Sequence, residues 1–168
     1  MPLIHFMGRI FNYHKNRAQE SRRFIAQKMF VEQHYEKFHC AFRRGVLECV
    51  GNIRPTDYSP KYRIRIRYKQ YGIPSVRILD PYIEPSVRIH MYSNGDLCLF
   101  HPPSQPWSGD NDLHKTIIPW TAEWLVFYEL YLSEGRWLGP EVLHDTDLTA
   151  TNNSLENRRS ALHRGGSY

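Results

Sequence analysis

The sequence predicts an α+β fold in which an N-terminal helix, an antiparallel sheet and a long C-terminal helix follow one another along the chain. Apolar residues recur at helical spacing between about Arg17 and Lys37. Segments that alternate apolar and polar residues follow, as in half-buried strands. Aromatic residues then return at helical spacing from Pro119 to Gly135. We therefore expect a helix, a meander of about four antiparallel strands, an extended segment and an aromatic helix that packs across the sheet.

The composition is that of a globular protein. Of the 168 residues, 41% are hydrophobic and 14% are aromatic, which is more than disordered chains contain. No apolar run approaches the roughly 18 residues of a membrane span, and the N-terminus lacks a signal-peptide pattern. We expect one domain over residues 1–146, a flexible tail over residues 147–168, a cytoplasmic location and no membrane partner. The net charge of +5 is common among ordinary proteins, and we predict no specific nucleic-acid partner.

Cysteine usage and motif content bear on redox state and cofactors. Cys40, Cys49 and Cys98 are an odd number of cysteines in a chain without an export signal, so we expect reduced thiols. Cys98 and His101 have the spacing of a metal-binding pair, but no second pair at ligand spacing accompanies them. The sequence also lacks a Gly-rich phosphate loop. We therefore predict neither a metal site nor a cofactor.

The first predicted helix has an apolar stripe and a basic face. The stripe consists of Phe24, Val31, Tyr35 and Phe38, with Ala18, Ile25 and Met29 beside it. The opposite face carries Arg17, Arg22, Arg23, Gln27 and Lys28. Charged helix faces commonly do no more than face solvent, and the alternative is a binding surface for a partner protein.

Three segments read as strands: residues 39–51, 62–68 and 76–80. Val87, Ile89 and Met91 then lead toward the cysteine segment. In the middle segment, Tyr and Ile residues form one face and arginines form the other, namely Arg63, Arg65 and Arg67. We favour the interpretation that this row keeps the sheet surface soluble, and phosphate recognition is the alternative.

The segment around Cys98 is expected to hold the thiol at the rim of a loop. Asn94 and Gly95 form a tight-turn signal, because both residues tolerate the positive φ that a two-residue reversal requires. Apolar residues surround the thiol and prolines follow it: Leu97, Leu99, Phe100, Pro102, Pro103 and Pro106. A lone cysteine in an apolar run is more commonly a core residue than a reactive group, so its position alone assigns no role.

The order Ser93-Asn94-Gly95-x-x-Cys98-Leu99, followed by Trp107, resembles the active-site segment of ubiquitin-conjugating enzymes. The strand pattern before it extends the resemblance over most of the first hundred residues. The resemblance implies a UBC-like fold, in which the cysteine carries the C-terminal glycine of a ubiquitin-like protein as a thioester. Cys98 is thereby implied as the catalytic residue of an acyltransferase.

Further motifs are similar to one branch of this family, the small stand-alone bacterial proteins encoded in cyclic-oligonucleotide-based antiphage signalling (CBASS) operons. The motifs are Leu-Cys-Leu-Phe-His-Pro at 97–102, Ile-Ile-Pro-Trp-Thr-Ala-Glu-Trp-Leu-Val-Phe-Tyr-Glu at 117–129 and Gly-Arg-Trp-Leu-Gly at 135–139. The similarity implies a role in antiviral defence. It also implies a protein partner with a C-terminal glycine, the operon's cyclic GMP-AMP synthase-like nucleotidyltransferase.

The sequence departs from the family at the oxyanion position. Ubiquitin-conjugating enzymes resemble one another in a His-Pro-Asn motif, whose Asn lies eight residues before the cysteine and is assigned to the oxyanion. Here Arg88-Ile89-His90 stands in its place. The His90 imidazole can donate to an oxyanion or accept a proton from an incoming amine. The alternative is a structural histidine that bonds a backbone carbonyl.

Several further residues are candidates for supporting roles. His101 would lower the pKa of Cys98 or cap the loop, and Asn94 shapes the turn. Asp110, Asp112 and His114 fall in the loop where the family places acidic or polar gate residues.

Three functions stay open at this point. Cys98 favours a cysteine acyl carrier, whereas the missing His-Pro-Asn motif favours a non-catalytic UBC-fold module that binds a protein. The third function, a nucleic-acid binder that uses the arginine strand, would show an affinity that falls steeply with salt.

Overall fold

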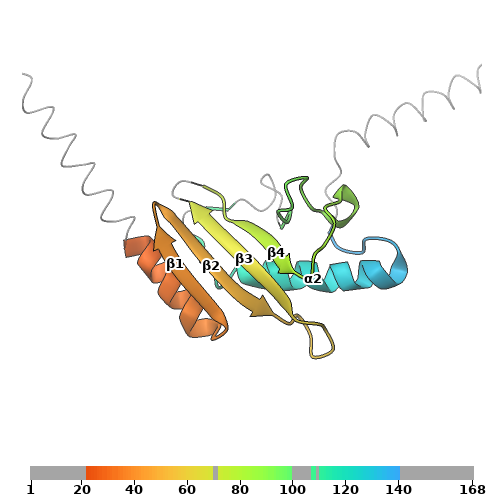
Figure 1. The fold of residues 1–168 in the computed structure, drawn as a ribbon, viewed down its shortest axis with the longest axis horizontal. Coiled ribbons are helices and arrows are strands. Elements are labelled where there is room, and N and C mark those ends of the chain that lie inside the picture. Colours follow the sequence, from red (N-terminus) through yellow and green to blue (C-terminus); the bar gives the residue numbers. More distant parts are fainter. Residues whose placement is uncertain (1–21, 70–71, 100–106, 109, 141–168) are drawn as a thin grey trace, which may run out of the picture. The chain divides into compact units, whose positions relative to one another are not determined.

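The computed structural model describes residues 22–69, 72–99, 107–108 and 110–140, and it is an α+β protein (Figure 1). An N-terminal helix covers residues 22–34. The remaining elements are β1 (Phe38–Arg43), β2 (Val46–Ile53), β3 (Tyr62–Lys69), β4 (Ser75–Asp80), the short 3-10 helix η1 (Val87–Ile89) and α2 (Ile117–Glu134). The strands form one antiparallel sheet in the order β1-β2-β3-β4. The predicted helix, four-stranded meander and long C-terminal helix are thus confirmed.

The chain divides into two units, Met1–Leu138 and Gly139–Tyr168. The sheet, both helices and the candidate site belong to the first unit. The tail predicted over residues 147–168 lies outside the described residues, so it stays a prediction.

Residues 39–51, which were expected to form one strand, contribute to two strands, β1 and β2. Arg44 and Gly45 both have positive φ, at 50° and 74°, and reverse the chain between β1 and β2. Two central residues with positive φ are the geometry of a tight hairpin turn that matches the twist of the strands. Arginine is not a turn signal, so the sequence pattern did not reveal this reversal. Val87–Ile89, in contrast, forms the 3-10 turn η1.

The core lies between the sheet and α2, which crosses one face of the sheet (Figure 1). Alternate residues of β3 are buried in it: Tyr62, Ile64, Ile66 and Tyr68. Their arginine neighbours point to the other face, as the alternation predicted. From α2, Ile117, Trp124 and Leu125 are buried, with Trp124 stacked on Tyr128 at a ring-centroid distance of 5.4 Å.

The ends of α2 follow the predicted signals. Pro119 lies in its first turn, where a missing N–H breaks no helical hydrogen bond. Gly135 ends the helix with a φ of 72°, and its N–H donates to the Tyr131 carbonyl at 2.9 Å. The helix therefore begins and ends for local reasons.

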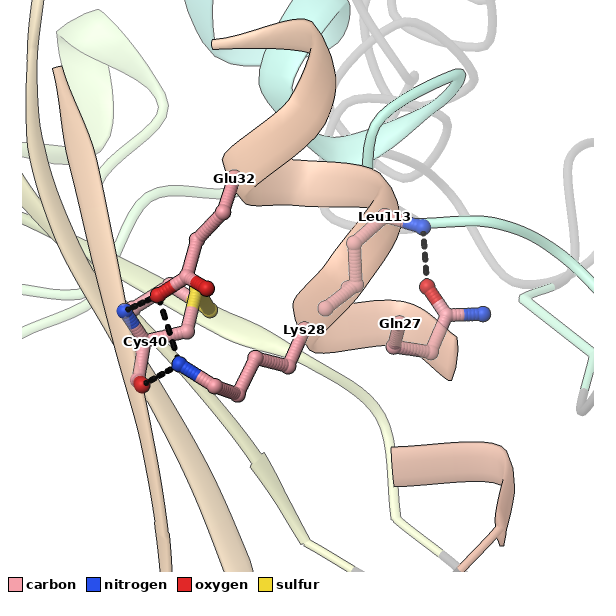
Figure 2. Close-up of a disulfide and its surroundings, with 6 residues drawn as sticks. Gln27, Lys28, Glu32, Cys40 and Leu113 are labelled. Carbon is pink, nitrogen blue, oxygen red and sulfur yellow. Dashed lines mark hydrogen bonds and ion pairs between the residues drawn. A yellow bond between two sulfur atoms is a disulfide. The ribbon is translucent and has the colours of Figure 1, made fainter. Parts of the chain in front are cut away.

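The N-terminal helix buries Phe24 and Val31 as predicted. The residues expected to flank them in the core are exposed, however, and a residue expected in solvent is buried. Ile25 and Met29 are 53% and 61% exposed. Gln27, which was expected on the solvent side, is only 4% exposed. Its Oε1 accepts the N–H of Leu113 at 2.8 Å (Figure 2), and its Nε2 donates to Asp112 Oδ1 at 3.2 Å. Gln27 is buried because the polar backbone of the loop before α2 needs a partner there.

Two charged residues of the same helix cover the outer edge of β1 (Figure 2). Glu32 accepts the Cys40 N–H at 2.9 Å, and Lys28 Nζ donates to the Cys40 carbonyl at 2.7 Å. Lys28 and Glu32 are also 2.7 Å apart as an ion pair. The hydrogen bond from Lys28, followed by that from Cys40, lowers the pKa of Glu32. These side chains satisfy edge groups that would otherwise invite another strand.

Cys40 and Cys49 form a disulfide, which corrects the expectation of reduced thiols (Figure 2). The two residues lie directly opposite each other in the β1–β2 register. The backbone groups of Cys40 bond the helix rather than β2, and antiparallel side chains stand closest at such non-hydrogen-bonded pairs. The register depends on the unpredicted turn at Arg44 and Gly45, so counting cysteines did not reveal the bond.

We predict that reducing the disulfide lowers the free energy of unfolding by up to about 2.5 kcal/mol, because a short closed loop then opens in the unfolded chain. Urea unfolding of the oxidised and reduced protein measures this difference. The Cys98→Ser variant serves as the control and should show the same effect. Identical midpoints with and without reductant would contradict the prediction, and maleimide labelling counts the thiols in each sample.

His114 is a buried histidine at the contact between the N-terminal helix and the loop before α2. It is 6% exposed, and its ring packs on those of His34 and Phe30 at centroid distances of 4.4 and 5.2 Å. Its Nδ1 has no hydrogen-bond partner among the described residues. Burial, reinforced by the charge of His34, lowers the pKa of His114 below its ordinary 6.5. The buried His114 ring is therefore more stable in its neutral form than in its protonated form.

We predict that His114 makes stability depend on pH below about 6.5. A lowered pKa in the folded state means that the unfolded chain takes up the proton first, so stability is lost as the pH falls through 6.5 toward the folded value. The melting temperature of His114→Phe should fall less between pH 7 and pH 5 than that of the wild type. The exposed His39, replaced as His39→Gln, is the control. Parallel curves for the wild type and His114→Phe would refute the assignment.

Candidate active site

Backbone hydrogen bonds hold Cys98 on an extended segment beside the sheet. The Leu97 N–H donates to the Val76 carbonyl of β4 at 2.8 Å, and the Cys98 N–H donates to the His90 carbonyl at 2.9 Å. Met91 and Leu97 form an isolated antiparallel bridge, and both are 5% exposed. These buried neighbours fix the backbone on either side of the thiol. Cys98 itself is a free, partly buried cysteine outside the strands of the sheet.

The turn before Cys98 spans Tyr92 to Asp96. The Gly95 N–H donates to the Tyr92 carbonyl at 2.8 Å, and the Tyr92 N–H donates to the Asp96 carbonyl at 2.9 Å. Gly95 has a φ of 85°, whereas Asn94 is not among the described residues with positive φ. The expectation that both residues need positive φ was therefore wrong. Asn94 acts instead through its side chain, whose Oδ1 accepts the Asp96 N–H at 2.9 Å.

Arg77 of β4 fastens this turn to the sheet. Its Nε donates to Asp96 Oδ1 at 3.1 Å, and a second guanidinium nitrogen lies 3.0 Å from the same oxygen. The guanidinium also bonds the Asn94 carbonyl. Arg77 and Asp96 were not singled out from the sequence, because nothing in a local pattern pairs residues on separate segments.

His90 adopts a left-handed conformation directly beside Cys98. Its φ of 53° and ψ of 51° cap η1, and such a conformation costs a non-glycine residue about 1 kcal/mol or more. The His90 ring packs on Trp137 at a centroid distance of 5.1 Å, and Trp137 packs on Trp124 and Phe127 of α2. The backbone of His90 thus lies next to that of Cys98, and its imidazole packs against an aromatic cluster.

Tyr92 is a residue of this site that the sequence analysis missed. A hydrogen bond with the Cys98 side chain, followed by burial and the charge of the thiolate, raises the pKa of Tyr92 to about 12. The phenol therefore stays protonated at neutral pH and places an O–H donor next to the sulfur. Tyr92 begins the turn and Cys98 lies just after it, so the reversal of the chain brings the two residues together. The predicted turn was therefore the one sequence signal that could have identified Tyr92.

The residues predicted to form a gate lie against the N-terminal helix instead. Asp112 pairs with Lys115 at 3.2 Å and accepts from Gln27, and His114 is buried on the helix as described above. Asp110 is exposed, and its N–H donates to Ser108 Oγ at 3.3 Å. None of the contacts recorded for these three residues within the described segments joins them to Cys98. His101 lies outside the described residues.

The predicted basic face of the N-terminal helix divides into engaged and exposed residues. The Arg23 guanidinium lies 6.0 Å from the centroid of the Tyr68 ring, and Lys28 is bound to Glu32 and Cys40. Arg22 is exposed, and Arg17 lies outside the described residues. A partner-binding role for this face therefore stays a prediction that rests mainly on Arg22.

No group of three or more His, Cys, Asp or Glu side chains in the described part of the chain is arranged to hold a metal ion. No helix among the described segments is long and apolar enough to cross a membrane.

Comparison with known proteins places this site in a family. No curated protein matches the chain. Residues 27–145 match a family model described as Type II CBASS E2 protein, and this range includes the whole sheet, the turn before Cys98 and α2. The match covers well over half of the chain and agrees with the UBC-like order of helix, antiparallel meander and helix. The chain therefore belongs to the family of type II CBASS E2 proteins.

Proposed function

We propose that this protein is a ubiquitin-conjugating-like acyltransferase of bacterial antiphage defence. Cys98 accepts the C-terminal glycine of a protein as a thioester and passes it to an amine. The observation that carries the proposal is the position of Cys98, which is a free cysteine. Its backbone N–H is hydrogen-bonded to His90, and its side chain is hydrogen-bonded to Tyr92. The CBASS family match favours the system's cyclic GMP-AMP synthase-like nucleotidyltransferase as the donor of the glycine. The reaction takes place in the cytoplasm.

In the charging step, the Cys98 thiolate attacks a glycine carbonyl that another enzyme or group has already activated. The sulfur–carbon bond forms, the bond to the activating group breaks and the thiol proton passes to solvent or to a base. Activation must precede this step, because a thiolate does not displace oxygen from a free carboxylate. Tyr92 places an O–H donor next to the sulfur that attacks.

In the discharge step, an amine attacks the thioester carbonyl and a tetrahedral oxyanion forms. Donors placed at that oxygen stabilise it. His90, whose carbonyl accepts the Cys98 N–H, is proposed to supply an N–H, and Tyr92 an O–H. The carbon–sulfur bond then breaks, the Cys98 thiolate leaves, and the proton lost by the amine passes to solvent or to a base. The aromatic packing of His90 on Trp137 restrains the ring before the reaction, so less reorganisation is needed in the transition state.

A second candidate function is a non-catalytic UBC-fold module that binds a partner protein. The observation that favours it is His90 at the position where the resembling enzymes have asparagine. A module of this kind forms no covalent adduct, so the experiment on Cys98 separates the two functions.

We predict that co-expression with the CBASS nucleotidyltransferase and the other proteins of its operon, so that any activating enzyme is present, yields a covalent adduct that a thiol reductant releases. Intact-mass analysis should find it with the wild type. Cys98→Ser should abolish the adduct or leave an oxyester that resists the reductant. The double variant Cys40→Ser/Cys49→Ser is the matched control and should keep the adduct. A reducible adduct that survives Cys98→Ser, or a wild type that forms none, would contradict the proposal.

We further predict that His90→Ala slows transfer to the amine by about a hundredfold or more while thioester formation stays largely intact, as for the loss of one oxyanion donor. Single-turnover discharge of a preformed Cys98 thioester to free lysine measures this step alone. His90→Asn should restore part of the rate, because it recreates a donor. Tyr92→Phe, which removes only the hydroxyl, should slow discharge by about tenfold.

Arg88→Ala is the control for the His90 variants, because Arg88 is exposed on the same turn. Its discharge rate should equal that of the wild type. Unchanged discharge in His90→Ala would assign His90 a structural role and leave the oxyanion to Tyr92 and backbone N–H groups near Cys98.

A further inference from the structure

The face of the sheet opposite the core carries a row of arginines. Arg63, Arg65 and Arg67 of β3 alternate with buried residues and point away from the core. Arg77 of β4 lies directly opposite Arg65 in the register. Like charges directly opposite each other on a sheet are destabilising. The arrangement therefore carries a cost that an anionic ligand would relieve.

A cleft of about 570 Å³ adjoins one end of this row. It lies between the residues that follow the N-terminal helix and the outer face of β1, β2 and β3. Its lining consists of Glu36, Lys37, His39, Val50, Gly51, Asn52 and Arg63. Two permanent cations and a histidine face one carboxylate there, so the cleft is basic like the row that it joins.

The positive charge of this surface is only partly balanced within the protein. Arg67 lies 3.5 Å from Glu48, and Arg77 is bound to Asp96. Neither Arg63 nor Arg65 has an ion-pair partner among the described residues. The Nε of Arg65 is shielded from solvent, and no acceptor for it occurs in the described part of the chain. An unsatisfied N–H of this kind carries a desolvation cost, which a small shift of the Arg65 side chain toward a bound carboxylate would remove.

We propose that Arg63, Arg65 and the adjoining cleft bind an extended, carboxylate-bearing segment of a partner protein. Side chains on one face of a strand are spaced about 6.5 Å apart, and alternate side chains of an extended peptide have the same spacing. A segment with acidic residues at alternate positions would thus meet successive arginines. This interaction is separate from the thiol chemistry, so it stands or falls independently of Cys98.

A protein segment fits this surface better than a nucleic acid does. Single-stranded nucleic acids are bound by aromatic side chains on which bases stack. The outward positions of β2 and β3 hold Val, Glu, Asn, Arg and Lys residues and no aromatic ring. Glu36 in the cleft and Glu48 beside Arg67 would repel phosphates along a continuous backbone, whereas a peptide can place neutral residues opposite them.

Fluorescence anisotropy with a defined probe tests the proposal. The probe is a labelled peptide of four glutamates alternating with threonines, and the same peptide with glutamines is its neutral counterpart. At about 0.15 M salt, the wild type should bind the acidic peptide and not the neutral one. Arg63→Gln/Arg65→Gln should weaken binding about tenfold, as expected for two lost charge-assisted hydrogen bonds.

The double variant Arg88→Gln/Arg136→Gln is the matched control, because it removes the same charge from exposed positions elsewhere. It should keep the wild-type affinity within about twofold, since surface charges beyond a Debye length are screened. Equal losses in both double variants would show mere attraction to net charge and overturn the proposal. An oligothymidylate of equal charge that binds more tightly than the peptide would also overturn it in favour of nucleic acid.

A measurement on the wild type keeps the test independent of folding in the variants. In a two-dimensional NMR titration, the acidic peptide should shift backbone amides of β3 and of His39. Shifts confined to other elements would refute the assignment of the surface.

Discussion

The hydrogen bonds from the Leu97 and Cys98 N–H groups are the constraint on which the candidate site depends. One attaches the cysteine segment to β4 and the other attaches it to His90. Arg77 reinforces the first connection by bonding the turn that precedes the cysteine. Because β4 is part of the sheet and His90 packs on Trp137, which contacts Trp124 and Phe127 of α2, both layers of the domain position the same thiol. Any change that separates the sheet from α2 would therefore also displace the site.

Side chains of the N-terminal helix bond the outer edge of β1, where a further strand would otherwise pair. Lys28 and Glu32 satisfy the outer backbone groups of Cys40, while Gln27 satisfies the loop that leads into α2. The helix is thus joined to β1 and to the loop before α2 through hydrogen bonds as well as apolar burial. Its exposed Ile25 and Met29 follow from this orientation, because the buried side of the helix is occupied by Gln27.

The two faces of the sheet have opposite physical characters. One is apolar and packs on α2, and the other is dominated by the arginines of β3. The alternation of a single strand produces both faces, since successive side chains point in opposite directions. The two proposals use this division, one placing thioester chemistry at Cys98 beside β4 and the other a partner segment on the charged face.

The sequence alone determined the features whose geometry is set by residues close together in the chain. The alternation of β3, the positions of Pro119 and Gly135 in and after α2, and the glycine turn before Cys98 are local, and the structure agrees with each. Cys98 was predicted from a contiguous motif that resembles a family's active-site segment, and His90 from the position of that family's asparagine, and both roles stay predictions. Only the tertiary structure decided the disulfide between Cys40 and Cys49, the burial of Gln27, the contact of Tyr92 with Cys98 and the placement of His114 on the N-terminal helix. Each of these depends on strand register or on which segments pack together, and a register that shifts by one residue turns every side chain to the other face.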